Sequence, residues 1–237
     1  MCGTSRLIYF RIPCDKEQMR PIVPQKWAHF PATVLLALLA AAPASAHPHV
    51  WVTVRSELDF APDGKIIGLV QDWKFDEMYS SFAVQGLAKD GGLAKREDFV
   101  PMATENTASL AEAGFYTILK IGGKQADFDN VTEFWMEEGR DKLVNYHVVL
   151  PLRAPTAPGR LLTLQVADPE FFIDFEFDDR DGLKLVNAPS GCSNSLAKPK
   201  PLEAADKTKL TESFFSGLAI GSNFGFKMAT HAIIACP

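Results

Sequence analysis

The sequence has few cysteines, no long apolar run and none of the compact motifs that mark common enzymes. Four cysteines occur in 237 residues. The longest apolar stretch, residues 32–42, is shorter than the roughly 20 residues that a membrane-spanning helix requires. The chain lacks a nucleophile elbow, an HExxH zinc motif, a phosphate-binding loop and a CxxC pair. These absences predict a protein that is not an enzyme and has no transmembrane helix.

The amino-terminal segment has the three parts of an export signal. Two basic residues precede an apolar core at residues 32–42, and the small residues 44–46 (ASA) form a cleavage pattern. We predict a signal peptide over residues 1–46, cleavage after Ala46 and a periplasmic location. Residues 1–18 contain acidic residues that are untypical of a signal, so translation from Met19 is an alternative start.

Cleavage changes the size and charge of the chain. Removing 46 of the 237 residues leaves 191, enough for one domain with a sizeable core. The formal net charge changes from −5 to −8, because five basic and two acidic residues are removed. A strongly acidic chain argues against nucleic acid and anionic membranes as partners and is compatible with cations. We predict a single soluble periplasmic domain over residues 47–237.

Only two cysteines, Cys192 and Cys236, follow the predicted cleavage position. In an oxidising compartment two such cysteines most simply form one disulfide. It would close a loop over residues 192–236, about 45 residues long and worth roughly 4 kcal/mol in the chain-entropy account. Two free, buried thiols are the alternative.

Alternating apolar and polar residues predict strands through most of the mature chain. Residues 49–60 and 65–74 form a hairpin, with the valines of the first strand facing the core. Helical periodicity predicts two helices, at residues 76–89 and 97–113. Further strands are expected at residues 115–121, 125–137 and 143–152, as a meander, and at 161–166, 171–177, 183–187 and 232–235. This order predicts an α+β fold, a mostly antiparallel sheet or sandwich with two inserted helices.

The predicted mature terminus carries candidate metal ligands. His47 would present a free amine and an imidazole on one residue, and His49 lies on the same face of a strand. Such nitrogens suit nickel, copper, zinc or cobalt. Pro48 has no amide hydrogen, which excludes the square-planar motif built on deprotonated backbone amides. The alternative is a solvated terminus whose histidines bind nothing.

Four further residues are candidates to complete this site. His147 could join it if its strand neighbours the first strand, although an ordinary half-buried histidine is the alternative. Asp72, Asp76 and Glu77 could supply a carboxylate ligand or orient an imidazole. Acids near a helix N-terminus also complement the helix dipole, which is the alternative for the last two. The acidic run at residues 174–181 lacks the spacing of an EF-hand, so we expect a solvated strand face and turn.

Several segments resemble a family of exported bacterial proteins of unknown function. They are residues 47–52 (HPHVWV), 73–80 (WKFDEMYS) and 168–174 (DPEFFID), with a glycine-rich tail that ends at Cys236. The family is described as the periplasmic, substrate-binding component of an uncharacterised ABC-type transport system, often encoded near nickel/cobalt-type permeases. The resemblance spans essentially the whole mature chain. It implies an inner-membrane partner, either a metal permease or ABC transporter subunits.

Together these features predict a periplasmic transition-metal-binding accessory, or substrate-binding component, of a metal transport system. One alternative is a copper-dependent oxidase or oxygenase that uses the amino-terminal histidine. A second is a docking partner of an inner-membrane permease that binds no metal. In that case an exposed Trp51 face and the tail would contact the permease.

Overall fold

The computed structural model describes residues 48–88, 92–199 and 223–237. The elements described here belong to one compact unit within residues 45–237. His47 and the predicted export signal lie outside the described residues, so cleavage after Ala46 stays a prediction. Within the described residues, no helix is long and apolar enough to cross a membrane.

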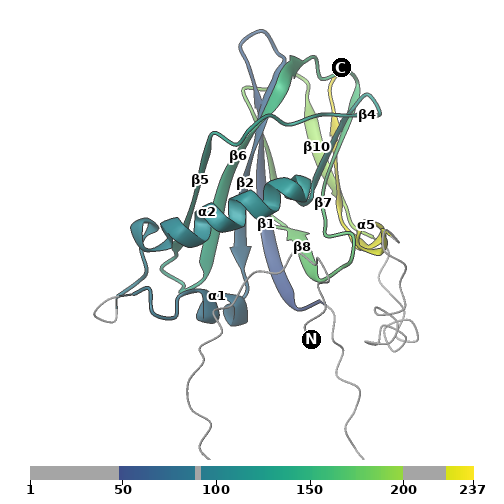
Figure 1. The fold of residues 1–237 in the computed structure, drawn as a ribbon. Coiled ribbons are helices and arrows are strands. Elements are labelled where there is room, and N and C mark those ends of the chain that lie inside the picture. The colour runs from purple at the N-terminus through teal and green to yellow at the C-terminus, as the bar shows by residue number, and fades with distance from the viewer. Residues whose placement is uncertain (1–47, 89–91, 200–222) are drawn as a thin grey trace, which may run out of the picture. The chain divides into compact units, whose positions relative to one another are not determined.

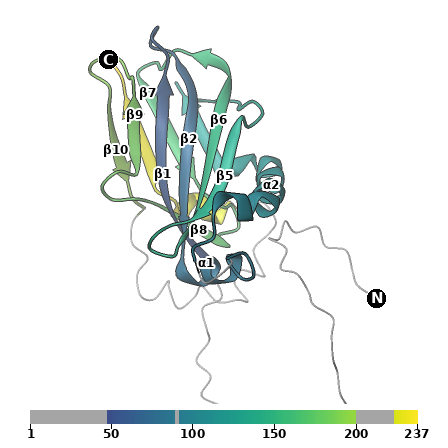
Figure 2. The same cartoon turned by 90° about the vertical axis from the view of Figure 1, so that its left-hand side faces the viewer.

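Two β-sheets pack around a common apolar core (Figures 1 and 2). The strand order is β5-β6-β2-β1-β8 in the first sheet, where β9 also pairs with β1, and β10-β11-β7-β3-β4 in the second. The strands of the first sheet are β1 (Val50–Phe60), β2 (Ile66–Phe75), β5 (Glu133–Glu138), β6 (Val144–Thr156), β8 (Ile173–Phe177) and β9 (Leu183–Val186). The strands of the second are β3 (Thr117–Ile121), β4 (Lys124–Gln125), β7 (Leu161–Val166), β10 (Ser193–Ala197) and β11 (His231–Ala235). The predicted α+β fold is confirmed.

The first two strands form the predicted hairpin. β1 pairs antiparallel with β2, and Val52 is the register partner of Phe75. Val52 and Val54 are buried, whereas Trp51, directly before Val52, is 48% exposed. The alternation places one face of β1 in the core and the other towards solvent, since successive strand residues point in opposite directions.

The helices lie between β2 and β3 and near the end of the chain. They are α1 (Glu77–Ala83), α2 (Arg96–Glu112), the 3₁₀ helix η2 (Gly114–Tyr116) and α5 (Phe224–Met228). α2 runs beside β5 and β6 (Figure 1), and the Thr107 hydroxyl lies 2.9 Å from the Tyr146 hydroxyl. α1 ends at Ala83, short of the predicted end at residue 89, while α2 lies within one residue of its predicted bounds at both ends.

The prediction of a continuous meander over residues 115–152 is wrong. β3 and β4 belong to the second sheet, whereas β5 and β6 belong to the first. The strand expected at 125–137 is interrupted, because β4 ends at Gln125 and β5 starts at Glu133. The alternation of apolar residues marks which face is buried, but it does not specify the sheet to which a strand belongs.

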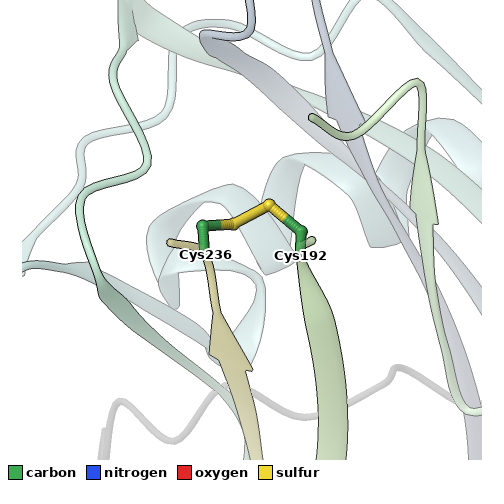
Figure 3. Close-up of a disulfide and its surroundings, with 2 residues drawn as sticks. All are labelled: Cys192 and Cys236. Atoms are coloured by element: carbon green, nitrogen blue, oxygen red, sulfur yellow. A yellow bond between two sulfur atoms is a disulfide. The ribbon is translucent and has the colours of Figure 1, made fainter. Parts of the chain in front are cut away.

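The predicted disulfide is present between Cys192 and Cys236, with the Cα atoms 4.2 Å apart (Figure 3). Cys192 directly precedes β10, and Cys236 directly follows β11. The two strands pair antiparallel from Ser193 opposite Ala235. The disulfide therefore ties the outer strand of the second sheet to its neighbour.

Candidate metal site

His49 directly precedes β1 and is exposed. Its backbone N–H donates to the carbonyl oxygen of Phe172 at 2.9 Å. Its imidazole lies against the Phe172 ring, with 4.5 Å between the ring centroids. The backbone before β1 is thus held in place at His49, which is an exposed residue.

Asp76 holds the start of β1 against α1. Its Oδ2 accepts a hydrogen bond from the Trp51 N–H and its Oδ1 one from the Tyr79 N–H, both at 2.9 Å. The Asp76 N–H in turn donates to the Trp51 carbonyl oxygen at 3.0 Å. Asp76 is therefore the N-cap of α1, the alternative that its sequence position left open. Glu77 follows it as an exposed residue in the first turn.

His147 and Asp72 form a pair on the solvent-facing side of the first sheet. His147 Nδ1 lies 2.7 Å from Asp72 Oδ1, and the His147 side chain is 16% exposed. The imidazole stacks on Trp135 at 3.6 Å, and the Arg96 guanidinium lies 4.1 Å from the Trp135 ring centroid. Stacking and the carboxylate together fix the orientation of this imidazole.

The structure separates His147 from His49. β6 pairs with β2 and not with β1, and Arg55, Asp72 and His147 lie on one register line across the three strands. Arg55 is six residues beyond His49, so at about 3.3 Å per residue the two histidines lie about 20 Å apart along the strands. A single ion cannot bind both. In the described part of the chain, no three or more His, Cys, Asp or Glu side chains are grouped to hold a metal ion.

The segment at residues 168–173 forms a loop that positions Phe172. The buried Asp168 carboxylate accepts backbone hydrogen bonds from Glu170, Phe172 and Ile173 at 2.9–3.1 Å. Gly225 of α5 donates its N–H to the Pro169 carbonyl oxygen at 3.0 Å. This 168–173 loop therefore connects α5 to the residue on which His49 rests.

A family model described as "Protein of unknown function (DUF1007)" matches residues 32–236. The chain belongs to the DUF1007 family. No curated protein matches the chain. The match covers His49, the 168–173 loop and both disulfide cysteines, and it confirms the predicted membership in a family of unknown function. The description gives no ligand, partner or activity, so the transport association stays a prediction.

Asp174 of this DUF1007 protein starts the acidic run for which the sequence predicts a solvated strand face. β8 runs parallel to β1, with Asp174 as the register partner of Trp51. The side chain is half-buried, and burial, followed by the charge of Glu176, raises its pKa to about 6. Asp174 is therefore not part of the fully solvated strand face that the sequence predicts. The parallel pairing of β1 with β8, which sets Asp174 beside Trp51, joins segments more than 100 residues apart and could not be read from the sequence.

The rest of the acidic run has the predicted role of a turn. Asp178 accepts the Arg180 N–H at 2.9 Å and a hydrogen bond from the Arg55 guanidinium at 2.9 Å. These two bonds hold the pKa of Asp178 well below its usual range. Arg55 also lies 3.2 Å from Asp181. These carboxylates connect the end of β8 to β1 and are already paired.

Proposed function

We propose that this protein is an exported, non-catalytic accessory of an inner-membrane metal transporter, and that its mature amino terminus binds a transition metal ion. The ligands are the amine and imidazole of His47 and the imidazole of His49. The metal ion is the cargo of the system, which the protein holds and passes to the transporter. Transport is inferred from the sequence resemblance, and metal binding from the ligand chemistry.

The observation that carries the proposal is the position of His49. Its backbone is hydrogen-bonded to Phe172 and its exposed side chain stands directly before β1, two residues after the predicted new terminus. A terminal chelate requires a ligand that is both fixed and accessible, because flexible ligands lose conformational entropy when they bind. The Asp76 carboxylate accepts the N–H of Trp51, two residues after His49, and so also holds the first residues of β1 in place.

The expected metals follow from the ligands. Imidazole and amine nitrogens suit Ni²⁺, Cu²⁺ and Zn²⁺, and binding should weaken in acid because protons compete for the same nitrogens. His147 is not included, since it lies about 20 Å from His49 along the strands. Its bond to Asp72 makes it a structural histidine in this proposal.

Adding one residue before His47 is expected to lower the affinity for Ni²⁺ by about 100-fold, because it turns the terminal amine into an amide and destroys the chelate ring. The measurement is calorimetric titration of metal-free mature protein and of the extended protein with Ni²⁺, Cu²⁺ and Zn²⁺. His147→Ala is the matched control and should bind like the wild type. Equal affinity in the extended protein, or no binding by the wild type, would reject the amino-terminal site.

A second candidate function, docking to a permease, is favoured by an exposed apolar cluster at the same end of the sheets. Trp51, Met78 and Phe82, the terminal apolar cluster, are 48%, 53% and 58% exposed. Trp51 is hydrogen-bonded to Asp76 at the start of α1, and Met78 and Phe82 lie one helical turn apart on α1. Exposed large apolar groups that cluster often mark protein contacts.

Replacing all three residues of the terminal apolar cluster by serine is expected to abolish co-purification with a co-expressed nickel/cobalt-type permease, because the contact loses its apolar area. Ni²⁺ titration of the variant should be unchanged. The control variant carries serine at Val100 and Leu161, which are similarly exposed, at 57% and 52%, on other elements. Co-purification that survives the triple change, or that the control change also abolishes, would count against docking through this cluster.

A further inference from the structure

A cleft opens at one edge of the two sheets, between β9 of the first sheet and β10 of the second. The two strands lie side by side there (Figure 2), yet within the described residues each is paired on one side only, β9 with β1 and β10 with β11. The cleft has a volume of about 420 Å³, and small-molecule sites typically measure about 300–1,000 Å³. Leu183 of β9 pairs with Ser56, seven residues after His49, so the cleft lies about 23 Å from His49 along the strand. It is therefore separate from the proposed metal site.

The lining of the cleft combines apolar and charged side chains. Leu183, only 7% exposed, and the half-buried Leu196 both pack on the common core. Asn194 lies two residues before Leu196 and so shares its face of β10. The other lining residues come from the turn between β8 and β9 and from the end of β10: Asp179, Arg180, Gly182 and Lys198. A ligand in the cleft would thus meet apolar surface beside charged groups.

The charges of the lining leave one cation without a carboxylate. Lys198 Nζ lies 2.5 Å from Asp179 Oδ1, so these two charges compensate each other. The other two carboxylates of the turn pair with Arg55. Within the described residues, no carboxylate forms an ion pair with the Arg180 guanidinium. With two cations and one carboxylate, the lining has a net charge of +1, whereas the whole chain has a formal net charge of −5.

We propose that this cleft binds a small organic carboxylate, with Arg180 holding the carboxylate group and Leu183 and Leu196 contacting the apolar body. A guanidinium can donate two parallel N–H bonds to a carboxylate, which fixes the orientation of the ligand as well as its charge. The side-chain amide of Asn194, which has no hydrogen-bond partner among the described residues, supplies a further donor. A monoanion matches the single uncompensated positive charge, and the leucines favour an apolar body over an inorganic ion.

Titration of the mature protein with pentanoate at neutral pH, followed by NMR, tests the proposal. Pentanoate carries a carboxylate on a short apolar chain. Pentanamide has nearly the same shape without the charge, and inorganic phosphate has charge without the chain. We expect pentanoate to shift the methyl signals of Leu183 and Leu196 in a saturable way at millimolar concentrations, and the other two compounds to bind at least about 5-fold more weakly.

Arg180→Met is the test variant and Arg140→Met is its matched control. Each change removes one exposed arginine from a turn between two strands, so the loss of overall charge is the same. The backbone N–H of residue 180 still donates to Asp178 in the variant, so the turn should persist and both variants should melt at the wild-type temperature. We expect Arg180→Met to weaken pentanoate binding at least about 5-fold, and Arg140→Met to change it by less than about 2-fold.

Three results would overturn the proposal. The first is the absence of saturable shifts of the Leu183 and Leu196 methyl signals with pentanoate. The second is equal pentanoate affinity in the two variants, or pentanamide binding as tight as that of pentanoate, because either would show that Arg180 does not hold a carboxylate. The third is phosphate binding as tight as that of pentanoate, which would reject an organic ligand.

Discussion

Replacing Cys192 and Cys236 together by serine is expected to lower the free energy of unfolding by about 4 kcal/mol. The disulfide joins residues 44 apart in sequence, so it restricts a long loop of the unfolded chain. Its loss returns this conformational freedom to the unfolded state while the strands of the folded state keep their register. The measurement is urea unfolding of the mature wild type and the double variant at neutral pH.

Loss of the disulfide should destabilise β10 more than the other strands. This strand is largely exposed and pairs with β11 at the outer side of the second sheet. Amide exchange in β10 is expected to rise before that of β1 and β2, which are paired on both sides in the centre of the first sheet. The reduced wild type is the control and should match the double variant. A loss of less than about 1 kcal/mol in the free energy of unfolding would contradict this explanation. It would show that the disulfide acts mainly on the native state and that loop closure in the unfolded chain contributes little.

The sequence predicts the face of each strand well because burial acts on every second residue. The alternation in β1 correctly predicts that Val52 and Val54 lie in the core and that Trp51 does not. β7 has the predicted bounds, Leu161–Val166. The oxidising compartment that the predicted export signal implies also predicts the disulfide, since only two cysteines follow the predicted cleavage position. Each of these inferences depends on neighbouring residues or on a simple count.

The candidate site could be predicted only in part, because it depends on which strands pair. β8 follows β1 by more than 100 residues, and its alternation would be the same beside any partner. Nothing in the sequence therefore indicates that Asp174 lies beside Trp51. The same limit applies to His147 and Asp72, which lie 75 residues apart and meet because β6 pairs with β2. Pairing over such distances is set by the packing of the whole core.

Gly225 is the position where the smallest change should have a large effect. A Cβ atom at Gly225 would clash with the carbonyl oxygen of Asp168, and this oxygen belongs to the backbone and cannot rotate away. Gly225→Ala is therefore expected to lower the free energy of unfolding by about 3 kcal/mol, at the upper end of the usual cost of overpacking. Urea unfolding measures this loss. The sequence shows Gly225 only as part of a glycine-rich tail and does not predict that it packs against Asp168.

The consequence for the metal site follows from the contacts of the 168–173 loop. α5 contacts the loop at Asp168 and Pro169, and Phe172 of the loop accepts the His49 N–H. Displacing α5 or the loop should therefore loosen His49 and weaken Ni²⁺ binding, even though Gly225 is not a proposed ligand. Asp168→Asn is the matched control for the loop, because it keeps the shape but removes an acceptor for one of three backbone N–H groups. We expect Asp168→Asn to lower both the free energy of unfolding and the Ni²⁺ affinity, each by less than Gly225→Ala does. Stability lost in both variants with unchanged Ni²⁺ affinity would show that Phe172 does not position His49 for binding.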